Sequence, residues 1–350
     1  MRRLRRSLVY ASFLLLCGEV GAKALLLTPW VRGRLPPEST LSWRARWVGR
    51  YLFTDRRVFY GFDDYDPTKG WVLRPSLRDF RQFAGSTVSS NSRGARGVEE
   101  PPLLRRPGRR RVVVLGDSFS FGEGVDDGEA WPRRLQDLLP DAEVVNLAVH
   151  GYGHDQMLIR LREEVPRYRP DLVLLGFFAD DAARNTLDFR DYAKPRFVLA
   201  AGGLTLVGSP VPSPPRALAR EALRLHLPEL LALPRARRRA ALRREQEPAL
   251  MAALLDRMRR DAAAEGARFA VVDLPPPGEI ALDTEVGPSE QVLLDYARGR
   301  AVLVCRTRAA LHGAWASGAG FRLEGHYDAA THAEVARVLA RCLIQGGVGL

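Results

Sequence analysis

Ser118 is the residue of this chain whose surroundings best suit a nucleophile. It follows a run of β-branched and aliphatic residues at 112–115 that is too short for a helix and predicts a buried strand of a parallel sheet. Gly116 ends that run and leaves room for another molecule to approach the backbone. Ligands of doubly wound sheets bind beyond the carboxyl ends of the strands, which is where Ser118 is expected. The position therefore favours acyl-transfer chemistry.

Three further segments follow the serine in a fixed order. Residues 146–153 read Asn-Leu-Ala-Val-His-Gly-Tyr-Gly, residues 176–181 read Gly-Phe-Phe-Ala-Asp-Asp, and residues 324–328 read Glu-Gly-His-Tyr-Asp. Together with the Gly-Asp-Ser triplet they resemble the four sequence blocks of the SGNH (GDSL-type) hydrolase superfamily. The resemblance covers residues 109–347 and is most specific in the serine block.

The resemblance implies a catalytic site. Ser118 is expected to be the nucleophile, His326 the base that takes its proton, and Glu324 the group that orients His326. Relatives carry aspartate at the place of Glu324, so Asp328 stays open as an alternative orienting group. His332, at the start of the last helix, is an alternative base.

The resemblance also implies an oxyanion site. Backbone N–H groups of Ser118 and Gly151 are the expected donors, together with a side chain of the third block. Asp180 stands where relatives commonly have asparagine, and an ionised carboxylate there would repel the developing oxyanion. Either burial keeps Asp180 protonated, or Asn185 donates instead, or the site binds acyl groups or glycans without turning them over.

Short apolar runs alternate with helical patterns, which predicts βαβ units. We expect an α/β fold, a three-layer α/β/α sandwich whose flavodoxin-like, doubly wound parallel sheet has about five strands. The predicted strands are 112–115, 143–148, 171–178, 269–274 and 301–304, and the predicted helices are 131–139, 157–165 and 333–343.

An insert near 186–262 interrupts this alternation. It begins with a hairpin signal at 196–207, and we expect that hairpin to shape the substrate pocket because it follows the third block. A helix-forming segment at 217–265 comes next, and its prolines 228, 234 and 248 are expected to break it.

Residues 1–27 combine four arginines with an apolar stretch, which is typical of an export signal. Residues 8–27 are long enough to span a membrane if Glu19 and Lys23 are tolerated. The sequence therefore predicts a retained anchor, which we favour, or a signal peptide cleaved near Ala24. The arginines stay inside in either case, so the remainder faces the periplasm from the inner membrane, or is periplasmic or secreted after cleavage.

The sequence predicts three parts: the anchor or signal, an irregular extension and linker at 28–108, and the hydrolase domain at 109–350. The net charge of +12 comes from scattered arginines without an aromatic stacking motif, which favours a solvated basic surface over nucleic-acid binding. Metal-ligand spacing is absent, so no metal or cofactor is expected. Cys305 and Cys342 stand in apolar runs that favour buried thiols, although an exported chain allows them to pair.

The predicted function is that of a serine esterase acting through an acyl-serine intermediate. Export favours acylated small molecules, lipids or polysaccharides of the cell envelope or extracellular space as substrates. Two alternatives stay open. One is an O-acyltransferase that passes the acyl group to a glycan; the other is a catalytically weakened glycan-binding or envelope-assembly protein, which Asp180 and Glu324 favour.

Overall fold

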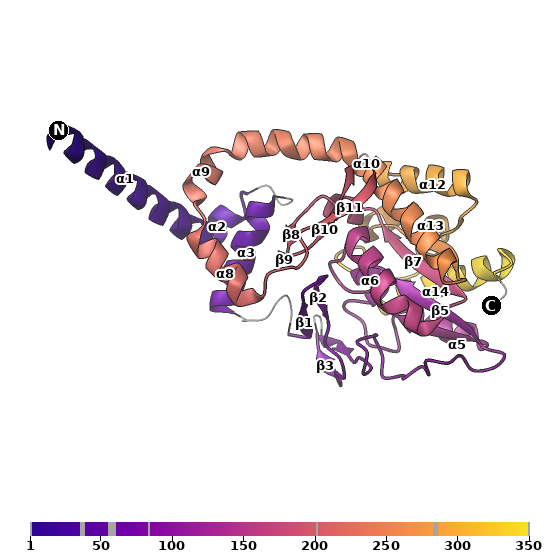
Figure 1. The fold of residues 1–350 in the computed structure, drawn as a ribbon. Helices are drawn as coiled ribbons and strands as arrows, with labels where there is room; N and C mark the ends of the chain where they lie inside the picture. The colour runs from indigo at the N-terminus through magenta and orange to yellow at the C-terminus, as the bar shows by residue number, and fades with distance from the viewer. Residues whose placement is uncertain are drawn as a thin grey trace.

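A five-stranded parallel sheet forms the centre of the protein (Figure 1), in the strand order β13-β12-β7-β5-β6. The computed structural model describes residues 2–35, 39–54, 61–82, 85–200, 202–282 and 286–348. The strands are β5 (Arg110–Leu115), β6 (Ala142–Asn146), β7 (Leu172–Phe178), β12 (Arg268–Leu274) and β13 (Leu303–Arg306). All five predicted strands are present. The last begins at Leu303 rather than at residue 301, because Ala301 ends the preceding helix in the left-handed conformation, with φ 51°.

Side chains of the sheet alternate between two faces, and each face has its own core. Val113 and Leu115 of β5 pack with α6 (His154–Tyr168), α10 (Leu233–Ala264) and α12 (Pro288–Arg300). Val112 and Val114 pack with α5 (Trp131–Leu138), α13 (Arg308–Ala316) and α14 (Ala329–Gln345). A strand that is apolar on both faces must be covered on both faces. The predicted three-layer α/β/α sandwich is confirmed.

The insert comes after the short helix α7 (Asp181–Arg184) and begins with the short strands β8 (Phe189–Arg190) and β9 (Tyr192–Ala193). Its hairpin, β10 (Arg196–Ala200) with β11 (Gly203–Val207), is antiparallel and packs against α10. Its helices are α8 (Pro214–Leu223), α9 (His226–Leu231) and α10.

Pro248 lies inside α10, so the expected break at this proline is wrong. A proline inside a helix removes one backbone N–H donor. The residues after it, Leu250, Leu254 and Leu255, are buried in the core and hold the helix against the sheet. Tertiary packing of an apolar face supplies most of the stability of a protein helix and here outweighs the proline.

The N-terminal region begins with α1 (Arg2–Leu27), which projects from the body far from the C-terminus (Figure 1). Within the described ranges, α1 is the one helix long and apolar enough to cross a membrane, by length and composition. It is followed by the helices α2 (Pro29–Arg32) and α3 (Thr40–Phe53). Two antiparallel hairpins come next, β1 (Asp63–Asp66) with β2 (Gly70–Leu73) and β3 (Phe80–Arg81) with β4 (Thr87–Val88). The extension was predicted to be irregular, but α3 is a regular helix within it.

Cys305 of β13 and Cys342 of α14 form a disulfide, with their Cα atoms 5.7 Å apart. The expectation of two buried thiols was wrong. An apolar run around a cysteine indicates burial, but it does not indicate which other buried residue lies beside it. Here β13 and α14 pack against each other and bring the two sulfur atoms together.

Candidate active site

Ser118 lies at the carboxyl end of β5, the strand between β6 and β7. It is the first residue of the short helix α4 (Ser118–Phe121). Asp117 caps this helix, since its Oδ1 accepts the N–H of Phe119 at 3.0 Å. The sharp turn from strand to helix presents the Ser118 hydroxyl at the edge of the sheet where ligands of such folds bind.

Two glycines allow α4 to lie directly on the sheet. A Cβ atom on Gly176 of β7 would come within 1.8 Å of the Ser120 Oγ, and one on Gly116 within 2.3 Å. Such distances are far below van der Waals contact, so any side chain at either position would displace Ser120. Gly116 and Gly176 therefore fix the position of the turn that carries Ser118.

His326 reaches Ser118 from the other end of the chain. Its Nε2 lies 2.9 Å from the Ser118 Oγ. The neighbouring Tyr327 is fully buried, donates its hydroxyl to the Pro275 carbonyl at 2.5 Å and packs edge-on against Phe119. The tyrosine therefore anchors the loop, and His326 is held against the α4 turn.

The carboxylates that the sequence offers as partners of His326 lie elsewhere. Glu324 is exposed, whereas the ion-pair contact of the His326 imidazole is with Glu123. Asp328 uses both oxygens at the start of α14: Oδ1 accepts the Thr331 N–H at 2.8 Å, and Oδ2 accepts the Arg322 N–H at 2.7 Å. Neither residue has the position expected of an orienting group.

Glu123 is the carboxylate that faces the imidazole. Its Oε1 lies 3.7 Å from the His326 Nδ1, and its side chain is 11% exposed. The backbone N–H of Glu123 donates to the Ser118 carbonyl at 3.0 Å, which ties it to the same turn. The sequence analysis missed this residue. The available signal was an acidic residue between two glycines, five positions after Ser118.

Behind the serine, Arg184 joins three segments that are far apart in sequence. Its Nη1 donates to the Asp117 Oδ2 at 3.0 Å, to the Tyr152 carbonyl at 3.0 Å, and to the Asp181 Oδ1. Burial, with the negative charge of Asp117 beside it, raises the pKa of Asp181 well above its usual range. The three segments are thus held together by one cation, whose side chain is only 12% exposed.

The expected oxyanion residues occupy three different environments. Gly151 has φ 75°, a left-handed conformation that suits glycine and sets the direction of its turn. Asp180 is exposed at the start of α7 and its side chain does not cap that helix. Asn185 is fully buried, where its side chain accepts the Asp155 N–H at 3.3 Å and contacts His154 at 3.1 Å. These contacts hold the Asn185 amide in place.

The N-terminal extension braces the loops around the serine. Arg96 donates to the carbonyl of Phe121, the last residue of α4, at 2.6 Å and to the Val125 carbonyl at 2.6 Å. Trp71 donates its indole N–H to the His150 carbonyl at 3.0 Å, in the segment after β6. The extension therefore supports both the serine and glycine segments.

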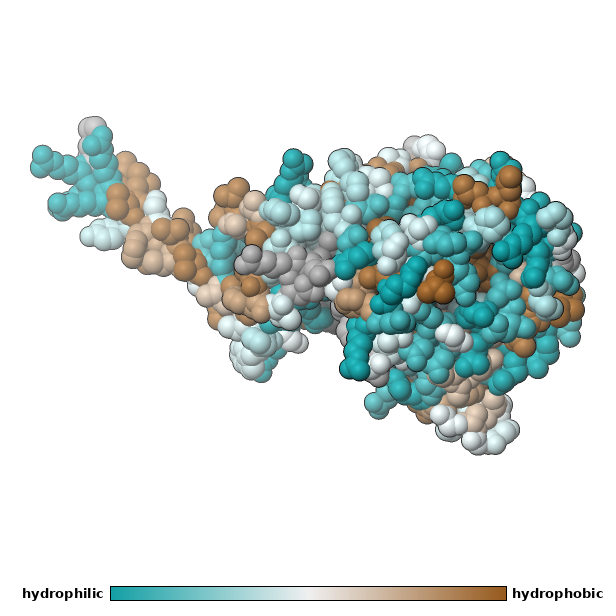
Figure 2. Space-filling view, turned by 90° about the horizontal axis from the view of Figure 1, so that it is seen from below, coloured by the Kyte–Doolittle hydropathy of each residue, from teal (hydrophilic) through white to brown (hydrophobic). Residues whose placement is uncertain are grey.

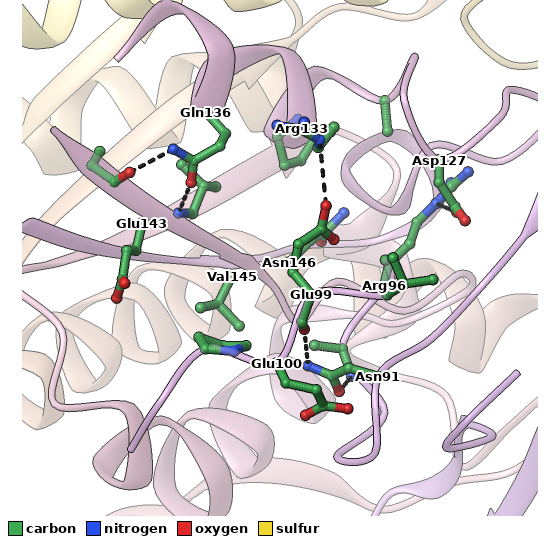
Figure 3. A pocket seen from close by; sticks show the side chains of 18 of the residues that line it. Asn91, Arg96, Glu99, Glu100, Asp127, Arg133, Gln136, Glu143, Val145 and Asn146 are labelled. Atoms are coloured by element: carbon green, nitrogen blue, oxygen red, sulfur yellow. Dashed lines mark hydrogen bonds and ion pairs between the residues drawn. The ribbon is translucent and has the colours of Figure 1, made fainter. Parts of the chain in front are cut away.

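A cavity of about 530 Å³ lies at the edge of β6 (Figure 3), and neither Ser118 nor His326 lines it. Arg133 and Glu99 face each other across it at 3.6 Å (Figure 3). The Gln136 side chain accepts the N–H of Val144 at 2.7 Å and donates to the carbonyl of Ala142 at 2.5 Å, both in β6. The polar groups of Arg133, Glu99 and Gln136 are therefore already paired with one another or with the backbone, and the cavity has no part in the proposed chemistry.

Within the described ranges, no cluster of three or more His, Cys, Asp or Glu side chains is suited to a metal ion.

Two other histidines near the site are fully buried. His332 accepts the Trp131 N–H on its Nδ1 at 3.2 Å and thus faces α5, while His154 contacts Asn185. Burial lowers the pKa of both imidazoles to about 3. Both are therefore neutral at neutral pH.

A sequence profile of the GDSL-like lipase/acylhydrolase family matches residues 114–334. The chain belongs to this family. Its members are serine ester hydrolases, and the matched residues run from β5 into α14, so they include both Ser118 and His326. The structure also brings these two residues into contact.

Other proteins resemble parts of the chain. An arylesterase from Vibrio mimicus is 35% identical over 78 residues, which span 21% of this chain and 39% of that protein. The crystal structure of TesA has a TM-score of 0.41 and 17% identity, covering 68% of this chain and 99% of its own. The psychrotrophic esterase EstA from Pseudoalteromonas sp. has a TM-score of 0.40 and 15% identity, covering 67% and 97%.

The buried histidines predict a pH-dependent stability. Because their folded pKa is about 3 against 6.5 for a solvated imidazole, the unfolded chain binds more protons between these values. The contribution of these histidines to the free energy of unfolding is therefore greatest above pH 6.5, and it is lost as the pH falls toward 3. Each histidine contributes about 2 kcal/mol to the difference between pH 8 and pH 5.

Urea unfolding at pH 8 and pH 5 tests this, with His332→Asn compared against the wild type. Asparagine retains an acceptor for the Trp131 N–H and does not titrate, so the variant is expected to lose about 2 kcal/mol less than the wild type. An identical pH dependence in the two proteins would contradict the assignment.

Proposed function

We propose that this chain is a membrane-anchored serine esterase that hydrolyses acyl esters of the cell envelope through an acyl-Ser118 intermediate. The observation that carries the proposal is the 2.9 Å contact between the Ser118 Oγ and the His326 Nε2. Proton transfer from a hydroxyl to an imidazole requires a separation of this size. Membership of an acylhydrolase family supports the same reaction.

In the first step, the Ser118 Oγ attacks the ester carbonyl carbon and His326 takes the serine proton. The bond from that carbon to the alkoxy oxygen then breaks, and the alcohol leaves with the proton from His326. Water attacks the acyl carbon of the intermediate and gives a proton to His326. Release of the acid returns this proton to the Ser118 oxygen.

Glu123, rather than Glu324, holds the imidazole in this proposal. A carboxylate near Nδ1 keeps the proton on that nitrogen, so that Nε2 is free to accept the serine proton, and it stabilises the imidazolium that forms. The 3.7 Å separation from Nδ1 and the low exposure of Glu123 support this role. Solvent screens a partly buried charge less than an exposed one.

The backbone N–H groups of Ser118 and Gly151 are the proposed oxyanion donors. Asp180 is exposed at the start of α7, and its side chain does not cap that helix. An aspartate therefore stands where relatives use an asparagine donor, and a carboxylate at that position repels a developing oxyanion. We expect slow turnover compared with a site that keeps all three donors.

The anchor in this proposal is α1, with its arginines on the cytoplasmic side and the following residues in the periplasm. Glu19, Ala22 and Leu26 of α1 are buried against later parts of the chain, which supports a retained helix, because cleavage near Ala24 would remove part of this packing. We further propose that residues 28–108 brace a catalytic unit formed by 109–350. Such an enzyme meets acylated lipids and polysaccharides at the membrane.

Covalent labelling of the full chain by a fluorophosphonate probe tests the proposed nucleophile. The wild type is expected to label, whereas Ser118→Ala and His326→Ala are not, since one lacks the attacking oxygen and the other its base. Ser120→Ala, which changes a serine on the same turn, is the matched control and should label.

Failure of the folded wild type to label would overturn the esterase proposal. If the protein labels but transfers acyl groups to an added glycan faster than to water, the acyltransferase alternative replaces hydrolysis.

Glu123→Gln is expected to lower kcat for ester hydrolysis by roughly 10²–10⁴-fold with little change in KM. The acidic limb of the pH–rate profile should also move to lower pH, because the imidazolium loses a stabilising negative charge. Glu324→Gln is the control and should stay within about twofold of the wild type, because its side chain is exposed. If Glu324→Gln lowers kcat much more than Glu123→Gln does, Glu324 and not Glu123 is the orienting group.

Asp180→Asn is expected to raise kcat by about tenfold or more, because an amide donates where a carboxylate repels the oxyanion. Asp188→Asn, another exposed aspartate of this region, serves as the control for charge alone. Steady-state hydrolysis of a soluble ester gives the comparison. A fall in kcat for Asp180→Asn alone would mean that the carboxylate takes part in the reaction.

A further inference from the structure

The second half of α1 is packed against the rest of the chain, although the first half projects freely (Figure 1). Ala22 and Leu26 are buried, and Gly18 lies so close to Leu227 of α9 that a Cβ atom would come within 2.9 Å of its Cδ2. The partner is the bend between α8 and α9. We call residues 223–231 the elbow.

The charged groups in this half of α1 are bound by the backbone around the elbow. The two carboxylate oxygens of Glu19 accept the N–H groups of His226 and Leu227 at 2.8 and 2.9 Å. Lys23 donates to the Ala222 carbonyl at 2.6 Å and lies 3.7 Å from Glu19. Polar groups at membrane depth must be satisfied within the protein, and these are.

The length of α1 fixes where the elbow lies if the helix spans a bilayer. A hydrocarbon core of about 30 Å needs about 20 helical residues, which corresponds to Leu8–Leu27. Residues 8–17 alone rise only about 15 Å, half of the core. Residues 18–27 must therefore lie in the outer leaflet, and the elbow that packs on them lies there too.

Three leucines of the elbow suit that position, and the exposed Arg224 between two of them is paired with Glu221 and Glu229. Leu223, Leu225 and Leu231 are 85%, 62% and 75% exposed, which is unusual for leucines clustered on one bend of a water-soluble surface. Figure 2 shows hydrophobic residues continuing from α1 onto the part of the body that it joins. Arg216 and Arg220 of α8 are exposed on the turns before the elbow, where lipid head groups would meet them.

We propose that the elbow is a second membrane-embedded element, whose three exposed leucines contact lipid acyl chains of the outer leaflet beside α1. This inference rests on the membrane anchor of the proposed function. The catalytic unit is then held at a fixed height and orientation over the bilayer, because two elements joined by buried contacts enter it instead of one flexible stalk.

Quenching of a thiol-linked fluorophore by lipids with brominated acyl chains tests the proposal. In a Cys17→Ser background, single cysteines replace Leu223, Leu225 or Leu231 in the elbow. Phe13→Cys reports on the first half of α1, and Leu104→Cys, at an exposed leucine of the loop before β5, is the matched control. The full chain is reconstituted in phosphatidylethanolamine–phosphatidylglycerol vesicles without reductant.

We expect the elbow and Phe13 labels to be quenched several-fold more by brominated lipid than the Leu104 label, which aqueous iodide should quench instead. Elbow labels quenched only by iodide, with the Phe13 label quenched by lipid, would overturn the elbow and leave the anchor intact. Elbow labels protected from both quenchers would show a protein contact, such as a second copy, in place of lipid. A Phe13 label that brominated lipid does not quench would overturn the anchor itself.

Discussion

The buried guanidinium of Arg184 is the interaction on which the site depends. It binds Asp117, which precedes Ser118, the carbonyl of Tyr152 in the glycine segment, and Asp181 after β7. These groups follow three different strands, so a single cation sets the positions of three strand ends relative to one another. Without it, two buried carboxylates would lie close together with no compensating charge, a loss that costs about 3–5 kcal/mol for a buried pair.

The same turn is also held from outside the sheet. Arg96 of the extension binds the carbonyl of Phe121 at the end of α4 and that of Val125 beyond it. Trp47 of α3 packs against Phe189 and Tyr192, which follow α7. Since α1 also contacts α3, packing connects α1 through α3 to the segment after α7.

Much of the fold follows from local sequence patterns. Each central strand is a short apolar run, and such a run is typical of a strand in a parallel sheet that is buried on both faces. The turn at Ser118 was predictable for the same reason, since Gly116 and Asp117 end the strand and start a helix. The existence of α3 and the continuity of α10 through Pro248 were not, because tertiary contacts decide both.

The candidate site was only partly predictable. The contact between Ser118 and His326 joins residues 208 positions apart, and the resemblance to a known family supplied it. Glu123 was missed because sequence reasoning searched for a carboxylate near His326 in the chain. In the folded protein, the carboxylate beside the imidazole comes from the segment that directly follows Ser118 and α4. Spatial proximity of this kind leaves no periodicity or spacing to detect.

The disulfide between Cys305 and Cys342 closes a segment that contains His326 and His332. The two cysteines are 37 positions apart, and closing a loop of that length removes chain entropy from the unfolded state worth roughly 4 kcal/mol. This contribution exists only where thiols are oxidised, as they are outside the cytoplasm. While the two thiols are reduced, the loop that brings His326 to Ser118 is restrained by packing alone, and a covalent bond closes it once they are oxidised. Completion of the site is thus linked to the redox state of the compartment that holds the protein.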